Sequence, residues 1–262
     1  GMGVEGCAYA TVIAQGISAV LCLGYIIKKF KVLRLRREDF RISLSSMRRL
    51  LALGIPMGLQ FSITAIGTII VQGAINVYGA VYMAGFSAAG KIQNIICTVF
   101  VSFGATVATY VGQNRGAGRM DRVKKGVYLT QLMILVWSVV VIAVIHFLGR
   151  YMIYIFVNPS ETEVLAAAGT YFDVVGWAYP FLGSIYLYRN ALQGMGYGLV
   201  PMLGGIFELA ARAGIVFFLA GKTSYAGVCL ADPAAWIAAL IPLIPYYFWM
   251  MRKKYGKYAA AK

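Results

Sequence analysis

Seven long apolar segments set the fold of this chain. Each has roughly 20 or more residues, which at about 1.5 Å per residue in a helix is enough to cross a hydrocarbon layer of about 30 Å. They lack the two-residue alternation of a membrane barrel, and backbone groups in lipid must bond internally, so we expect helices. The sequence therefore predicts an all-α, polytopic membrane helix bundle with about seven transmembrane helices. The segments cover residues 4–27, 50–77, 83–111, 125–148, 164–192, 199–220 and 227–251.

Composition agrees with an integral membrane protein. Hydrophobic residues make up 60% of the 262 residues and charged residues only 13%. That balance leaves too little polar surface to cover a soluble domain of this size. The four cysteines are scattered and form no CxxC pair, so neither a metal site nor a disulfide is expected.

The net charge of +15 indicates membrane topology rather than nucleic-acid binding. Twenty of the 24 lysines and arginines lie in alternate connections between the segments, and the positive-inside rule assigns such connections to the cytoplasm. We expect a multi-pass protein of the cytoplasmic membrane, with its first residue outside and its C-terminus in the cytoplasm. These bases should also attract anionic lipid headgroups, and no nucleic-acid partner is expected. They comprise nine residues within 28–49, then Arg115, Arg119, Arg122, Lys124, Lys125, Arg189, Arg252, Lys253, Lys254, Lys257 and Lys262.

The basic stretch between the first two segments divides the chain. It interleaves its bases with apolar residues, which is typical of an amphipathic linker on the cytoplasmic membrane surface. A weak repeat supports a joint here, because the first and last segments align with Gly6 opposite Gly227 and Tyr25 opposite Tyr246. Two parallel six-helix repeats would produce that alignment, and would make the rest of a first lobe the partner of this chain. The expected parts are 1–27 as the last helix of a first lobe, 28–49 as the linker, 50–252 as a six-helix C-terminal lobe and 253–262 as a cytoplasmic tail.

Polar side chains form rows on two neighbouring segments. In 83–111 they recur at a mean spacing of about 3.7 residues, and in 50–77 at every fourth position, so each row follows a helix face. Such rows indicate either a water-accessible substrate and ion pathway or hydrogen bonds between packed helices. We favour the pathway, because packing rarely requires continuous rows with a lysine and two glutamines. The rows are Gln60, Thr64, Thr68, Gln72 and Asn76, and Ser87, Lys91, Asn94, Thr98, Ser102, Thr106 and Thr109.

Ionisable residues inside the segments are candidate functional groups. Asp173 lies about ten residues into the fifth segment, near mid-membrane and before the kink residue Pro180. No base sits three or four positions away, so we expect a buried, unpaired acid that senses or couples the driving ion. Glu208 and Arg212 are one helical turn apart and are expected to form a structural ion pair. Lys91 either contacts an anionic substrate group or pairs with Asp173.

Several motifs resemble those of MATE (multidrug and toxic compound extrusion) transporters. The run Gly112-Gln113-Asn114-Arg115-Gly116-Ala117 is similar to the GQNxGA signature that closes their eighth helix. The runs Arg189-Asn190-Ala191-Leu192-Gln193-Gly194-Met195-Gly196 and Glu208-Leu209-Ala210-Ala211-Arg212 resemble their tenth-to-eleventh helix region. The starts of their seventh and twelfth helices resemble Gly54-Ile55-Pro56 and Ala231-Asp232-Pro233. The motifs occur in family order and cover nearly the whole chain.

The resemblance implies a transporter of twelve helices in two lobes, of which this chain would supply the sixth helix and the C-terminal lobe. It implies an antiporter that exports organic, often cationic, compounds by rocking its lobes, driven by inward sodium or proton flow and without another cofactor. Some branches of the family place a coupling carboxylate in the helix that corresponds to 50–77. Here that segment has Gln60 and Gln72 and no acid, so both coupling ions remain open.

Two other functions remain open. A lipid-linked sugar flippase of the same wider superfamily would share the two-lobe plan, but would need a more basic cavity than Lys91 and Arg212 provide. A non-transporting membrane scaffold would be indicated if the polar rows turned into tight helix contacts. An enzyme is not expected, because no metal-ligand cluster and no nucleophile with a base appears in the sequence.

Overall fold

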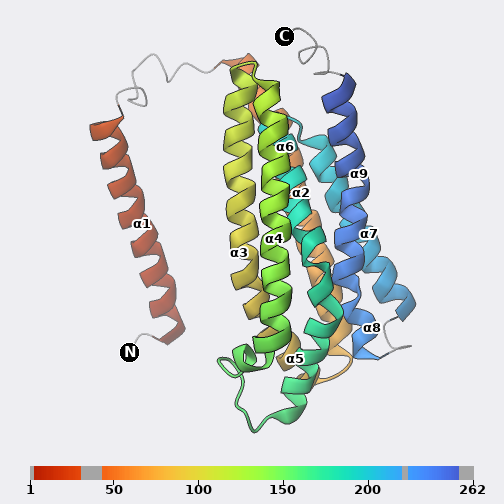
Figure 1. Ribbon diagram of the computed structural model, residues 1–262. Coiled ribbons are helices and arrows are strands. Elements are labelled where there is room, and N and C mark those ends of the chain that lie inside the picture. Colours follow the sequence, from red (N-terminus) through yellow and green to blue (C-terminus); the bar gives the residue numbers. More distant parts are fainter. Residues whose placement is uncertain (1–2, 31–42, 220–223, 254–262) are drawn as a thin grey trace. The chain divides into compact units, whose positions relative to one another are not determined.

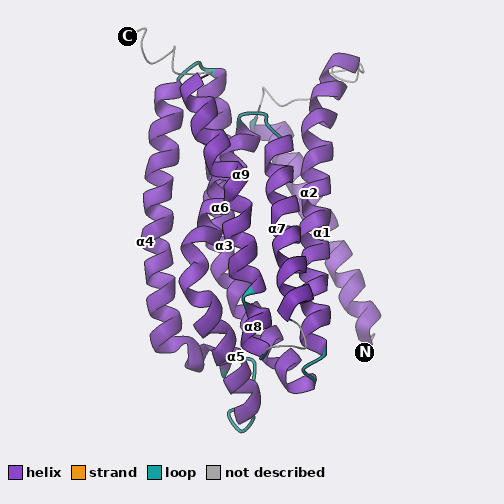
Figure 2. Cartoon of the chain, turned by 90° about the vertical axis from the view of Figure 1, so that its right-hand side faces the viewer, coloured by secondary structure: helices purple, strands orange, loops and turns teal. Residues whose placement is uncertain are grey.

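The computed structural model describes residues 3–30, 43–219 and 224–253, and these residues form helices joined by short connections (Figure 1, Figure 2). The predicted all-α class is confirmed. Most of the expected linker, residues 31–42, and nearly all of the expected tail, residues 254–262, lie outside the described residues. The elements are α1 (Gly3–Lys29), α2 (Leu44–Asn76), α3 (Ala80–Gly116), α4 (Met120–Ile153), α5 (Thr162–Val175), the 3-10 turn η3 (Gly176–Ala178), α6 (Tyr179–Gly194), α7 (Leu199–Leu219), α8 (Tyr225–Cys229) and α9 (Ala231–Lys253).

Six described stretches are long and apolar enough to cross a membrane: α1, α2, α3, α4, α7 and the α8–α9 pair. Several extend beyond the predicted segments. Helix α2, for example, begins at Leu44 rather than at residue 50, and its early bases Arg48 and Arg49 are exposed. A helix can continue past the apolar layer because its backbone bonds are internal while long basic side chains reach the polar interface.

The remaining apolar segment, 164–192, is not one continuous helix. Helix α5 ends at Val175, η3 follows, and α6 begins at Tyr179. Pro180 lies in the first turn of α6, where its missing N–H removes no helical hydrogen bond. The sequence predicted a kink in this segment, and the structure has an interruption of the α-helix three residues long.

The internal contacts divide the chain into two compact units, Gly1–Arg48 and Arg49–Lys262. The first contains α1 and the beginning of α2, and the second contains the rest of the bundle. The polar row of α3 and the contacts of Glu208 both lie within the second unit. The expected division into a first-lobe helix, a linker and a six-helix lobe stays a prediction.

Within the second unit, α3 packs against α4, α5 and α6, and α7 runs along α9 (Figure 1). Aromatic rings fill the space between these helices, and Trp236, Tyr171, Tyr179 and Phe100 are among the largest fully buried side chains. The α3–α4 turn and the C-terminal end of α9 lie at one end of the unit, while α5 and α8 lie at the other. We call these the basic end and the α5 end.

Two of the motifs that resemble MATE transporters meet at the basic end. A Cβ atom built on Gly194 of α6 would lie 2.5 Å from the carbonyl oxygen of Ala108 on α3. Because a backbone atom cannot rotate away, glycine is required for this close approach of the two helices. Arg115 belongs to the motif at the end of α3. Its guanidinium carbon lies 5.8 Å from the ring centroid of Tyr197, just after α6. These motif residues therefore hold α3 and the α6–α7 turn together.

Candidate functional site

The polar row of α3 lies on an exposed face of the helix. All seven of its members are exposed, whereas the opposite face of α3 is buried against α4, α5 and α6 through residues such as Ile92, Ile96 and Phe100. The predicted periodicity is therefore present in the structure as a continuous polar surface. The members are Ser87, Lys91, Asn94, Thr98, Ser102, Thr106 and Thr109.

The hydroxyl groups of this row donate to their own helix. Thr98 donates to the carbonyl oxygen of Asn94 at 3.0 Å and Ser102 to that of Thr98 at 2.9 Å. Thr106 and Thr109 make the same kind of bond one turn back. Each hydroxyl oxygen keeps acceptor capacity toward the exposed side. Among the described residues these hydroxyls do not join helices, so packing inside this unit does not explain them.

The five polar residues of α2 do not share one environment. Gln60 is buried and accepts a hydrogen bond from Nε2 of Gln193 at 3.1 Å, and Thr64 donates to Oε2 of Glu208 at 3.4 Å. Thr68, Gln72 and Asn76 are exposed. A four-residue step rotates about 40° around the helix, so four steps carry the row almost to the opposite side. The first two residues therefore belong to the interior of the lobe and the other three to its surface.

A buried ion-pair network joins α6, α7 and α9. Glu208 lies between two guanidinium groups: Nη2 of Arg189 is 3.0 Å from its Oε2, and Nη1 of Arg212 is 3.9 Å from its Oε1. The side chains of Arg189 and Glu208 are 13% and 5% exposed. The expected pair of Glu208 and Arg212 is thus within ion-pair distance, and Arg189 makes the shorter contact. Two charged partners and Thr64 offset the cost of burying the carboxylate.

The network continues into α9 and α5. Nη2 and Nε of Arg212 lie 3.2 and 3.3 Å from Oδ1 of Asp232. The Tyr171 hydroxyl lies 2.9 Å from Oδ2 of Asp232 and also contacts Oε1 of Gln93 on α3. Two acids and two arginines give the network a formal charge of zero, so it spans six helices, including α2 through Thr64, without a net buried charge.

One member of this network lies elsewhere than its sequence position indicated, and another has no local sequence signal. Arg189 was counted among the bases of a cytoplasmic connection, which is wrong, because it lies inside α6 and pairs with Glu208. Asp232 was noted only as part of a motif, since an acid in the first turn of a helix ordinarily stabilises the helix end. Arg212 has two acids as partners, and the second is remote in sequence, so helical spacing alone could not find it.

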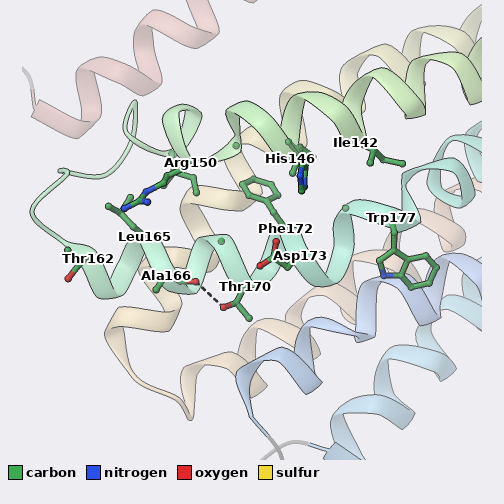
Figure 3. Close-up of a pocket in the computed structure, with 15 residues that line it drawn as sticks. Ile142, His146, Arg150, Thr162, Leu165, Ala166, Thr170, Phe172, Asp173 and Trp177 are labelled. Carbon is green, nitrogen blue, oxygen red and sulfur yellow. Dashed lines mark hydrogen bonds between the residues drawn. The ribbon is translucent and has the colours of Figure 1, made fainter.

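Asp173 does not occupy the buried, mid-membrane position that was expected. It is exposed on α5, two residues before the end of that helix. It lines an open pocket of about 670 Å³ at the α5 end together with His146 and Arg150 from the last turns of α4 (Figure 3). Because the apolar segment is broken after Val175, α5 ends beside the last turns of α4 and holds Asp173 there. Arg150 of α4 thus lines the same pocket as Asp173, but among the described residues no ion pair joins the two.

Lys91 does not pair with Asp173 among the described residues. Its ammonium group lies 5.1 Å from the ring centroid of Phe156, a cation–π contact with the connection after α4. Lys91 is otherwise exposed on the α3 row. Of the two expected roles for this lysine, the structural ion pair with Asp173 is absent here.

The polar row of α3 and most of the buried network lie in a part of the chain that matches a known family. The sequence profile of the family described as MatE matches residues 56–217, which include all of α3 as well as Arg189, Glu208 and Arg212. The chain belongs to the MatE family. The resemblance found from the motifs is thereby confirmed.

Relatives of this MatE chain are named as probable multidrug resistance proteins. "Probable multidrug resistance protein YpnP" of Bacillus subtilis is 28% identical over 199 residues, which cover 74% of this chain and 43% of that protein. "Probable multidrug resistance protein YoeA" of the same organism is 24% identical over 263 residues, which cover 97% of this chain and 56% of that protein. The chain spans about half the length of these curated relatives.

Solved structures share the fold. A MOP superfamily transporter from Pyrococcus furiosus aligns with a TM-score of 0.88 at 17% identity, over 97% of this chain and 58% of that chain. An outward-facing multidrug resistance MATE family transporter of the MOP superfamily aligns with a TM-score of 0.80 at 19% identity, over 93% and 56% of the two chains. The helices of this chain thus correspond to about half of such a transporter.

Proposed function

We propose that this chain forms the sixth helix and the C-terminal lobe of an antiporter that exports organic, often cationic, compounds across the cytoplasmic membrane by alternating access. The observation that carries the proposal is the exposed row of α3, whose hydroxyls donate only to their own helix among the described residues. A lysine and an asparagine facing lipid would be costly. Water, a substrate and the N-terminal lobe are the partners that would complement this row.

Substitutions in the middle of the row test this proposal. In the protein assembled with its N-terminal lobe, Asn94→Leu with Thr98→Leu should lower efflux of a cationic dye at least tenfold while the melting temperature changes little. Thr130→Val is the matched control, because Thr130 also donates to its own helix at 2.9 Å but lies on α4, away from the row. If efflux and melting temperature fell together, the row would be a packing surface and the scaffold alternative would be favoured.

We propose that the coupling ion is sodium or a proton, and that Asp173 senses it. Support comes from its setting in an open pocket, where among the described residues it makes no ion pair, whereas Glu208 and Asp232 are each held by arginines. A carboxylate free of a fixed partner can exchange an ion as its surroundings change. The whole transporter with Asp173→Asn should lose its dependence on pH or on sodium. Glu163→Gln, exposed on the same helix, is the control, and unchanged ion dependence in Asp173→Asn would eliminate the role.

The proposed orientation places the basic end in the cytoplasm and the α5 end outside. Its support is the base-rich α3–α4 turn, with Arg115, Arg119 and Arg122, against the single Arg150 near the end of α4. Single cysteines introduced at residues 113–124 should resist an impermeant thiol reagent in intact cells, and those at 155–161 should react. The reverse pattern would overturn the orientation.

A further inference from the structure

A second cavity, of about 350 Å³, opens between α4, α6 and α9 toward the basic end. We call it the α4–α9 cavity, and it lies apart from the α3 row and from the buried network. Tyr188 of α6 and Tyr247 and Phe248 of α9 give it an aromatic lining. Lys124 and Lys125, near the beginning of α4, also line it. The cavity therefore combines an apolar interior with two cationic groups.

These two parts lie at different depths along α4. Lys124 is four residues after the first residue of the helix, and Gln131 lies seven residues further on. At about 1.5 Å per residue, Gln131 is therefore about 10 Å deeper than the lysine. A phospholipid has the same profile, with an anionic phosphate above ester groups and acyl chains. A soluble anion would occupy only the upper part of the cavity.

The deeper part contains polar atoms without partners. Tyr247 is only 3% exposed, and its hydroxyl has no hydrogen-bond partner. Gln131 uses Nε2 to donate to Oγ of Ser184 at 3.1 Å, while its buried Oε1 remains unpartnered. A buried donor without a hydrogen bond is unfavourable, so the Tyr247 hydroxyl favours a ligand that brings an acceptor oxygen to this depth. An ester carbonyl of a lipid is such an acceptor.

The charge at the mouth favours an anion. Asp121 also lines the cavity, but it forms an ion pair with Arg119 at 3.0 Å. Arg119 therefore offsets the negative charge of Asp121, and Asp121 does not neutralise Lys124 or Lys125. On α9, the exposed Arg252 follows Phe248 by one helical turn and extends the basic surface around the mouth.

We propose that the α4–α9 cavity binds one anionic phospholipid from the leaflet at the basic end. Its phosphate contacts Lys124 and Lys125, an ester carbonyl accepts a hydrogen bond from Tyr247, and the upper acyl chain lies against Tyr188 and Phe248. The bound lipid then connects α4 with α6 and α9. The proposal depends on membrane insertion alone, so it holds whatever compound the transporter exports.

Lipid binding to the purified, detergent-solubilised protein tests the proposal. Native mass spectrometry would measure retention of phosphatidylglycerol and of phosphatidylcholine with the same oleoyl chains. Lys124→Gln with Lys125→Gln should weaken phosphatidylglycerol binding about tenfold, since each base near the surface contributes several-fold to such binding. Tyr247→Phe should weaken it about threefold, and the lysine variant should leave phosphatidylcholine retention unchanged.

Arg122→Gln is the matched control, because Arg122 is an exposed base on the same helix that does not line the cavity. A change below twofold in this variant supports a specific site. An equal loss in Arg122→Gln would replace the proposal with general attraction to a basic surface. Binding of glycerol phosphate as tight as that of the lipid would replace it with a site for a free anion, and unchanged retention in the lysine variant would eliminate it.

Discussion

The α3 row and the buried network satisfy their polar groups in opposite ways. On α3, exposed hydroxyls donate to carbonyl oxygens of the same helix, as Thr98 does to Asn94. In the network, a carboxylate on α7 is held by Arg189 on α6, and Arg212 on α7 is held by Asp232 on α9. One region therefore keeps acceptor capacity for something outside the described lobe, while the other uses its capacity to join helices.

This difference predicts which property each region controls. Removing a group that connects helices leaves its buried partners unpaired, and that cost falls on folding. Removing a group that is hydrogen-bonded only to its own helix leaves few buried polar groups without a partner. The change should therefore affect binding to whatever contacts the exposed face rather than folding. Three substitutions, from the largest expected effect on stability to the smallest, can break or sharpen the distinction.

Glu208→Gln should have the largest effect. The change removes the charge that holds Arg189 and Arg212 in the interior, and breaking a buried ion pair in this way typically lowers the free energy of unfolding by about 3–5 kcal/mol. Thermal unfolding of the purified protein in detergent would measure the loss. Glu163→Gln, an exposed acid on α5, is the control and should change little. A melting temperature preserved in Glu208→Gln would refute a structural role for the network.

Gly194→Ala should have an intermediate effect on stability. The added methyl group would lie 2.5 Å from the carbonyl oxygen of Ala108, so α6 and α3 must separate, and overpacking of this kind usually costs about 1–3 kcal/mol. The control is Gly90→Ala on α3, where an added Cβ meets nothing within 4 Å, and where alanine should be neutral or slightly stabilising. Equal melting temperatures for the two variants would contradict the close approach at Gly194.

Thr98→Val should have the smallest effect on stability, within about 0.5 kcal/mol, as for most exposed substitutions. The hydroxyl that is lost donates only to the Asn94 carbonyl of its own helix, and the shape of the side chain is kept. Thermal unfolding would again provide the measurement, now paired with efflux of a cationic dye by the assembled transporter. A loss of stability comparable to that of Glu208→Gln would remove the distinction between the two regions.

The helices were predictable because hydropathy and length suffice to identify a membrane span. The interruption at Gly176–Ala178 was not predictable, because the apolar segment continues through it. Pro180 indicates a bend but not how many residues the bend includes. The beginning of α2 was also missed, since bases such as Arg48 end an apolar segment without ending the helix. Sequence patterns thus locate the apolar layer better than they locate the backbone geometry within it.

For the site, what could be predicted depended on whether the partners were local. The α3 row follows one helix and appears from its spacing alone. The contact of Glu208 with Arg212 spans one turn and was also accessible. Arg189 and Asp232 come from other helices, and the base-bearing pocket of Asp173 is formed by α4 with α5. The spacing of residues within one helix contains no information about contacts between different helices.

The distribution of the ion pairs over α6, α7 and α9 has a consequence during synthesis of the protein. A chain made from its N-terminus exposes Arg189 before Glu208, which follows 19 residues later, and Arg212 before Asp232, which follows 20 residues later. At about 5–20 residues per second, Arg189 waits for Glu208, and Arg212 for Asp232 as its second acid, for roughly one to four seconds. Helix α9 is the last of these helices to be made, and it supplies Asp232. A nascent chain stalled before that helix would lack Asp232, so Arg212 would keep only its contact with Glu208 and the network would carry a formal charge of +1 instead of zero.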